Sequence, residues 1–186
     1  VLMDHFQLSS DQAFDFITGG LQRGLNANDD FLDSIREYSV QFDGGAEGAS
    51  QFFSLMETGM QGGILGTDKA SDAFKEFRVR LTDGSKTTSE AFELLGLNVD
   101  DVVQRIDNGS LTVADAWTLV TNRLRNVNDE SVRMQAGVGL IGTMFEDLGT
   151  EAVLNIDLAA TSVTDLADVT DSLSIKYDGL GNTLET

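Results

Sequence analysis

Hydrophobic residues recur every three to four positions along most of this chain, which is the spacing of one face of an α-helix. No segment keeps up the strict alternation of apolar and polar residues that would predict a β-strand. The apolar stripes are Phe31, Leu32, Ile35, Tyr38 and Phe42; Ala70, Ala73, Phe74, Phe77 and Leu81; Val99, Val102, Val103 and Ile106; Val113, Ala116, Trp117, Val120 and Leu124; and Met134, Val138, Ile141 and Phe145. The pattern predicts an all-α protein of short amphipathic helices.

Residues that start and stop helices stand at the ends of these stripes. Side-chain oxygens can accept hydrogen bonds from the free N–H groups of a first turn, and glycine closes a helix in the left-handed conformation at no Cβ cost. The candidate N-caps are Ser10, Asn28, Thr67, Asn98, Thr112 and Asp129, and the candidate closing glycines are Gly44, Gly84, Gly96, Gly109 and Gly149. The expected helices, eight or nine in all, are 10–24, 29–42, 47–62, 68–82, 87–95, 99–107, 112–126 and 130–148, with weaker ones after residue 150.

The first half of the chain repeats itself at a shift of 39 residues, which lays residues 13–42 onto residues 52–81. Aromatic, glycine and acidic positions coincide, so each unit reads as a helix, a glycine-containing turn and a second helix. Periods near 40 residues are typical of helical hairpins that bury their faces against their neighbours. We therefore expect a helical-hairpin domain over 1–149, repeat-like in its first half, and a looser helical or flexible C-terminal segment over 150–186.

The amino-acid composition argues against several classes of binding and catalytic site. The 186 residues hold 31 acids and 12 bases, a net charge of −19, and such a surface repels phosphate, so no direct nucleic-acid binding is expected. Cysteine is absent and His5 is the single histidine, which removes the material for thiolate chemistry, a Ser/His/Asp triad or a His-rich metal site. We expect no enzyme activity, with no catalytic residue, no cofactor and no metal.

Neither a secretory leader nor an apolar run long enough to cross a bilayer is visible in the sequence. The start at Val1 without an initiating Met, and the Gly/Asn-rich stretch over 177–182, are expected of a piece of a longer polypeptide.

Two motifs suggest ligand binding and are better explained by packing. The run 137–142 satisfies G-x-G-x-x-G, but it lies inside a helical stripe instead of following a strand, which favours close helix contact over a nucleotide. Asn26, Asn28, Asp30 and Glu37 have the spacing of calcium-loop ligands, but Phe31 stands where such a loop requires glycine. Ordinary helix-start roles are expected for Asn28 and Asp30.

Other features are also interpreted as structural. The glycines at small-xxx-small spacing, Gly20, Gly24, Gly59, Gly62, Gly63 and Gly66, predict tight hairpin packing. Acid pairs such as Asp29-Asp30, Asp100-Asp101 and Glu146-Asp147 arise readily among 31 acids and suit first helical turns, and Glu76 and Arg80 have the spacing of an ion pair. Trp117 lies on an apolar stripe and is expected to anchor the core.

Four blocks occur in an order that resembles the tail tape-measure proteins of long-tailed bacteriophages and prophages. They are 33–42 (DSIREYSVQF); 67–80 (TDKASDAFKEFRVR), with Asp83-Gly84-Ser85 behind it; Gly96-Leu97; and 142–149 (GTMFEDLG). The resemblance covers roughly residues 8–149.

This resemblance implies a structural protein of the virion, made in the bacterial host cytoplasm and placed in the lumen of the phage tail, with roles in tail-length determination, tail assembly and genome delivery. The implied partners are tail tube, tail tip or tail assembly chaperone proteins, with self-association and host membrane contact during ejection as further expectations. Two alternatives remain: a helical-repeat module that binds a protein, which an exposed apolar groove would favour, and a membrane-active segment used at DNA ejection.

Overall fold

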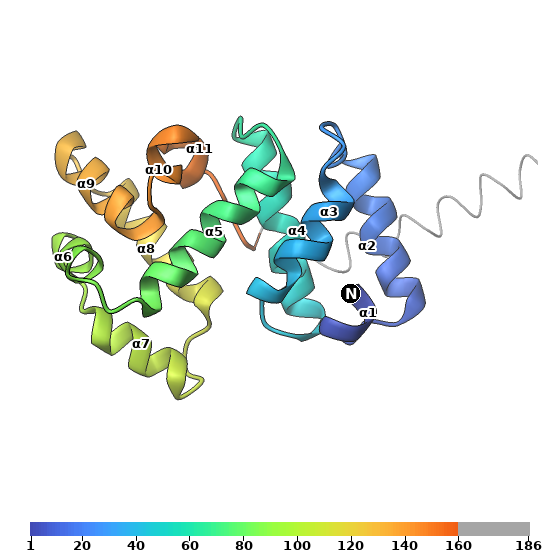
Figure 1. The fold of residues 1–186 in the computed structure, drawn as a ribbon, viewed down its shortest axis with the longest axis horizontal. Coiled ribbons are helices and arrows are strands. Elements are labelled where there is room, and N and C mark those ends of the chain that lie inside the picture. Colours follow the sequence, from blue (N-terminus) through green and yellow to red (C-terminus); the bar gives the residue numbers. More distant parts are fainter. Residues whose placement is uncertain (160–186) are drawn as a thin grey trace, which may run out of the picture.

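The computed structural model describes residues 1–159, and this part of the chain consists of helices and the turns that connect them (Figure 1). The helices are α1 (Leu2–His5), α2 (Ser10–Gln22), α3 (Phe31–Tyr38), the 3-10 helix η1 (Ser39–Gln41), α4 (Gly45–Gln61), α5 (Thr67–Thr82), α6 (Lys86–Leu94), α7 (Val99–Asp107), α8 (Val113–Arg125), α9 (Glu130–Ile141), α10 (Met144–Asp147) and α11 (Thr150–Leu154). The all-α prediction is confirmed.

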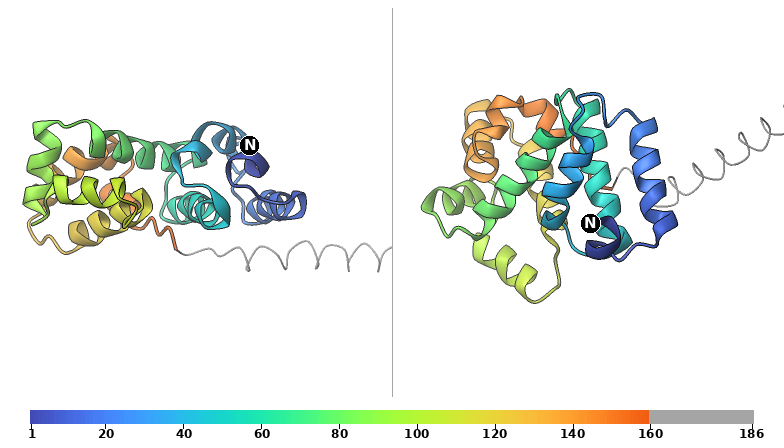
Figure 2. Two further views of the ribbon diagram at one scale, coloured as in Figure 1. Left: turned by 90° about the horizontal axis from the view of Figure 1, so that it is seen from below. Right: turned by 45° about the vertical axis from the view of Figure 1, so that its right-hand side comes forward.

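Helix α5 lies between two groups of helices, and both groups pack on it (Figure 1). It contacts α3 and α4 in the first group and α9 in the second. Helix α2 lies at one end of the long axis and α6 and α9 lie at the other, as the two turned views also show (Figure 2).

A row of aromatic rings makes the core continuous across α5. The rings of Phe42 and Phe74 stack with their centroids 4.3 Å apart, and Trp117 of α8 contacts Phe74 at 5.6 Å and Phe77 at 5.5 Å. All four side chains are buried, and each contributes about 2–3 kcal/mol through burial of apolar surface. Trp117 is a core anchor, as predicted.

The 39-residue repeat is present in the backbone as well as in the sequence. The amide of Leu25 donates to the carbonyl of Gly20 at 3.0 Å, and the amide of Ile64, 39 positions later, donates to the carbonyl of Gly59 at 3.0 Å. The glycines that turn the chain at these two places are Gly24, with φ 81°, and Gly63, with φ 102°. The turn between α2 and α3, the two helices called the first unit below, is therefore equivalent to the turn between α4 and α5, the second unit, although α4 and α5 pack more closely on each other than α2 and α3 do.

Three of the six predicted N-caps are confirmed. The side chains of Asn98, Thr112 and Asp129 accept hydrogen bonds from the first turns of α7, α8 and α9. The other three predictions, Ser10, Asn28 and Thr67, are wrong: the N-cap residues are Ser9, Asp30 and Gly66. At α2 the shift arises from a capping box, in which Ser9 and Gln12 each accept a hydrogen bond from the other's backbone amide.

The closing glycines follow the prediction with one exception. Gly84, Gly96, Gly109 and Gly149 have φ values of 64°, 68°, 75° and 88° and stand between consecutive helices. Gly44 has a φ of −66° and is the N-cap of α4, so the prediction that it closes the preceding helix is wrong. That helix, α3, ends at Tyr38, and the 3-10 helix η1 follows it directly.

The helix expected over 130–148 is two helices, which is a further correction. Gly142 breaks it with φ 71° and ψ −164°, and the chain then turns back. The turn places the Phe145 ring against Gly137, where a Cβ would clash with the ring. Burial of Phe145 thus decides a break that helical periodicity alone does not show.

Residues 150–158 pack in the same core. Helix α11 follows α10, and Val153, Leu154, Ile156 and Leu158 are all buried. The rest of the segment for which weaker helices were predicted lies outside the described residues. Helix α1, with four residues, is too short for a periodic pattern and was not predicted.

Candidate functional site

The first and second units pack together around the ring of Phe53, on α4. Its centroid lies 4.7 Å from that of Phe16 on α2 and 5.7 Å from that of Phe31 on α3, which it meets edge-on. All three rings are buried. Edge contacts of this kind contribute about 0.5–1.5 kcal/mol beyond burial, so the junction between the units has an aromatic centre.

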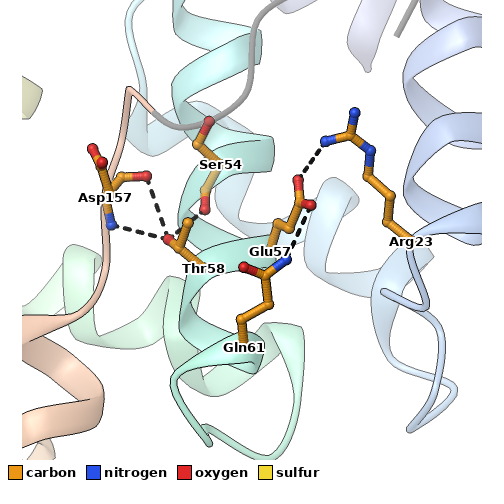
Figure 3. A network of polar contacts seen from close by, with 6 residues as sticks. All are labelled: Arg23, Ser54, Glu57, Thr58, Gln61 and Asp157. Carbon is orange, nitrogen blue, oxygen red and sulfur yellow. Dashed lines mark hydrogen bonds and ion pairs between the residues drawn. The ribbon is translucent and has the colours of Figure 1, made fainter. Parts of the chain in front are cut away.

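Two ion pairs also link the units. Arg23 Nη1 lies 2.7 Å from Glu57 Oε2, and Gln61 Nε2 donates to the other oxygen of Glu57 at 3.2 Å (Figure 3). Lys75 Nζ, on α5 of the second unit, lies 3.9 Å from Glu37 Oε1, on α3 of the first unit. Both pairs are partly exposed, so each contributes about 1 kcal/mol or less beside the aromatic contacts.

Polar groups also meet where α3 and α5 begin. The hydroxyls of Ser34 and Thr67 share a buried hydrogen bond of 2.9 Å. Asp30 Oδ2 accepts a hydrogen bond from the Asp68 amide at 3.2 Å, and the two carboxyl groups also bond to each other.

The two carboxyls have opposite pKa shifts. Burial raises the pKa of Asp68, and the facing Asp30 carboxylate raises it further against the lowering effect of the Lys69 amide. For Asp30, burial also acts upward, but hydrogen bonds from the Asp68 backbone, the Asp68 carboxyl and the Thr67 hydroxyl outweigh it, so its pKa is lowered. Asp30 is therefore the ionised acceptor and Asp68 is the member that takes up a proton first.

Tyr38 lies beside this junction. Its ring is buried, and Lys75 Nζ lies 5.4 Å from the ring centroid. Burial raises the pKa of Tyr38 to about 12, and the charges of Asp72, Glu37 and Asp68 add to the shift. The phenol stays neutral over the whole physiological range.

The far side of α4 holds the chain that leaves α11. The Thr58 hydroxyl donates to the Ser54 carbonyl at 2.6 Å and accepts from the Asp157 amide at 3.0 Å (Figure 3). Ile156 and Leu158, on either side of Asp157, are buried. Helix α4 thus connects the first unit on one side and the C-terminal part of the described chain on the other.

An apolar surface remains uncovered at the end of the array. Phe14 is 55% exposed, Leu21 46% and Leu32 53%. Next to them lies an open apolar pocket of about 320 Å³, lined mainly by residues of α1, α2 and α3: Val1, Leu2, Met3, Ala13, Ile17, Leu32 and Ile35, with Asp4 as its single charged residue. We call Phe14, Leu21 and Leu32, together with Arg36, the outer face of the first unit.

Several glycines of the two motifs pack against neighbouring helices. Gly137 and Gly139 lie inside α9, and a Cβ on Gly139 would lie 2.6 Å from the Cβ of Ala91 on α6. A Cβ on Gly59 would lie 2.8 Å from that of Ala70. Close helix approach is thus confirmed at Gly59, Gly137 and Gly139. The packing prediction is wrong for Gly24 and Gly63, which lie in turns with open space around them, and for Gly142, which ends α9.

The residues with calcium-loop spacing point to different partners. Asp30 bonds to Asp68, Asn26 donates to Asp29 Oδ1 at 3.4 Å, and Glu37 pairs with Lys75. The acid pairs lie in helix starts, in the first turn of α7 and in α10, and Glu76 pairs with Arg80 at 3.8 Å. The interpretation of these residues as structural is supported by each of these contacts.

Residues 1–159 hold neither a cluster of metal-ligating side chains nor a membrane-spanning helix. No three acidic or histidine side chains in this range gather closely enough to hold a metal ion. No helix within it combines the length and the apolar character needed to cross a membrane.

The described residues form a helical array with glycine turns and an aromatic interface that two ion pairs also link, and comparison with known proteins shows its class. Residues 1–142 match the phage-related minor tail protein family, and the chain belongs to that family. A probable tape measure protein of Streptomyces phage phiC31 is 42% identical over 150 residues, which is 80% of this chain and 20% of the relative. The resemblance to tape-measure proteins is thereby confirmed. The chain spans about a fifth of the length of that curated relative, and no solved structure matches.

Sequence reasoning missed the Asp30–Asp68 contact and the outer face. The 39-residue repeat contained a signal for the outer face, because it aligns Phe14 with Phe53. The structure exposes the first of these phenylalanines and buries the second. The Asp30–Asp68 contact had no such signal, because Asp30 and Asp68 are not equivalent positions in the repeat.

Proposed function

We propose that this chain is a folded architectural module of a phage tape-measure protein, placed in the tail lumen, where it takes part in tail assembly, tail-length determination and genome delivery. The match to a tape measure protein over 80% of the chain is the observation that carries this proposal. The expected partners are proteins of the tail tube, the tail tip or the tail assembly chaperones.

The fold supports a docking role over a direct measuring role. A helix rises 1.5 Å per residue, so 186 residues in one continuous helix would reach about 280 Å. The described α-helices have 4 to 17 residues and fold back on one another, which converts chain length into distance poorly.

An in-frame deletion of these 186 residues from the parent gene tests the assignment. A docking module predicts few or no assembled tails, and no proportional shortening of the tails that do form. Electron microscopy of tails checks this against a point variant that unfolds the module, Trp117→Asp, which should have the same assembly defect. Infectious particles with tails shortened by about 280 Å would contradict the docking role, because that is the length of a continuous helix.

A protein-binding repeat module is a second candidate, and the outer face of the first unit favours it. Exposed apolar surface at the end of a repeat array commonly marks a protein contact. This candidate is compatible with the first, since a tail module that docks must present a surface for docking.

A further inference from the structure

The outer face of the first unit is the repeat equivalent of the surface that the first unit covers on the second. At the shift of 39 residues, Phe14 corresponds to Phe53 and Leu32 corresponds to Ser71. Phe53 and Ser71 are 2% and 1% exposed at the junction between the units, whereas Phe14 and Leu32 are 55% and 53% exposed.

The charges on the two surfaces correspond as well. Lys75 lies 3.6 Å from Asp72 on its own helix and 3.9 Å from Glu37 of the first unit. Its equivalent, Arg36, lies 3.3 Å from Asp33, which is the equivalent of Asp72. The outer face thus repeats the same helix-internal pair, with Arg36 placed to receive a further carboxylate.

We propose that the outer face binds a further unit of the same kind, a helix, a glycine turn and a second helix, packed on the first unit as the first packs on the second. Such a unit places two rings around Phe14, as Phe16 and Phe31 surround Phe53, and a carboxylate beside Arg36, as Glu37 lies beside Lys75. The inference extends the proposed function by stating what the module docks, and it does not depend on the role in the tail.

The other occupants fit the surface less well. A second copy of this chain would have to offer the inner surface of its own first unit, which α4 and α5 already cover. An anionic lipid surface would be repelled, because residues 1–43 hold eight acids and two bases, a net charge of −6. A tape-measure polypeptide has ample chain for more units, since the relative is about five times as long as the matched segment.

A tandem duplication tests the proposal within the full chain. Insertion of a second copy of residues 10–48 between residues 48 and 49 reproduces the existing backbone junction, because position 49 is the repeat equivalent of position 10. The N-terminal copy is then the outer copy, and the copy next to residue 49 is the inner copy. The outer copy can pack on Phe14, Leu32 and Arg36 of the inner copy. The second unit and everything after it are unchanged.

The expected result is one cooperative urea transition whose slope rises by about a fifth, in proportion to the added chain, with a matching gain in helical circular dichroism. Phe14→Asp in the inner copy should lower the midpoint by about 1 M, as loss of a buried aromatic does at ordinary slopes. The same substitution in the outer copy is the matched control and should move the midpoint by less than about 0.3 M.

Cross-linking provides a second readout that does not depend on stability. Ser34 and Thr67 have hydroxyls 2.9 Å apart, and the inner-copy equivalent of Thr67 is Asn28. Because the chain has no cysteine, Ser34→Cys in the outer copy and Asn28→Cys in the inner copy should form a disulfide under mild oxidation. A control pair, Ser34→Cys with Gln22→Cys in the inner copy, should stay reduced.

Several outcomes would overturn the proposal. In the first, the inserted residues add no helix or unfold in a separate transition. In the second, Phe14→Asp has the same effect in both copies. In the third, the two cysteine pairs oxidise equally. Aggregation of the duplicated chain counts in the same way if inner-copy Phe14→Asp restores solubility. The 186-residue chain is tested alone by sedimentation: a dimer that Leu32→Asp dissociates, with Val79→Asp as the exposed control, would assign the face to a second copy instead.

Discussion

Gly20 on α2 lies directly beneath the ring of Phe31 on α3, so closely that a Cβ on Gly20 would clash with the end of the ring. Both residues are buried in the first unit. The contact closes the hairpin and exists because glycine occupies this one position of the helix.

Gly20→Ala should therefore destabilise the protein. Alanine favours a helix by about 1 kcal/mol over glycine, but overpacking against a fully buried ring costs about 1–3 kcal/mol, so a net loss is expected. Urea unfolding measures it. Gln22→Ala, at an exposed position of the same helix, should stay within about 0.5 kcal/mol, and a stabilised Gly20→Ala protein would show that α3 can move away from α2.

The Asp30–Asp68 pair predicts opposite effects for two equal substitutions. Asp68→Asn removes the carboxyl whose pKa is raised and keeps a donor for Asp30, so the free energy of unfolding at pH 7 should rise by about 0.5 kcal/mol. Asp30→Asn removes the carboxylate that the surrounding donors favour and should lower it by about 1 kcal/mol. Chemical denaturation at pH 7 compares the two variants.

The pH dependence of the pair follows from the signs of its pKa shifts. The raised pKa of Asp68 contributes stability that is complete below its ordinary value of 3.8 and is lost as the pH rises through the folded value. The lowered pKa of Asp30 contributes stability that is present above 3.8 and is lost as the pH falls through its folded value. Asp68→Asn should flatten the first part of the profile, and an unchanged profile would contradict the assignment of the raised pKa to Asp68.

Tyr38 predicts a loss of stability in alkali. Its pKa of about 12 in the folded protein, against 10.0 as the ordinary value, means that the contribution is complete below pH 10 and is lost as the pH rises toward 12. The loss should reach about 2–3 kcal/mol, the equivalent of a two-unit shift. Lysines titrate in the same range, so the measurement is the difference in alkaline unfolding between the parent chain and Tyr38→Phe. Equal curves would show that the phenol ionises freely.

Thr58 predicts a local effect. Thr58→Val keeps the shape of the side chain but removes the acceptor for the Asp157 amide, so hydrogen exchange at Asp157 should accelerate by about tenfold, the equivalent of roughly 1.4 kcal/mol. Exchange in α2 should not change, because α2 contacts the other side of α4. Faster exchange throughout the protein would mean that Thr58 supports the whole core. Thr18→Val is the matched control, because Thr18 is a partly buried residue of α2 whose hydroxyl also donates to the carbonyl four residues earlier, that of Phe14.

Helical periodicity predicted most of the fold because each helix encodes its own apolar face. The bounds of α7 agree to the residue with the expected 99–107, and those of α5, α6 and α8 agree within one. The Ser10 error is local, because Ser9 and Gln12 form the capping box. Two other errors lie where a contact beyond one helical turn is involved: Gly142 ends α9 and Phe145 returns to Gly137, and Asp30, the N-cap residue of α3, bonds to Asp68. Local patterns do not contain those partners.

Phe14 and Phe53 show most directly what each level determines. The sequence by itself determined that both occupy the same place in a repeated helix, glycine turn and helix, and that the chain is helical, acidic and without material for thiol or histidine chemistry. Only the tertiary structure decided that Phe53 is buried between two rings and that Phe14 is exposed. The physical reason is that side-chain spacing along a helix specifies which face is apolar, whereas burial depends on whether another element of the chain packs over that face.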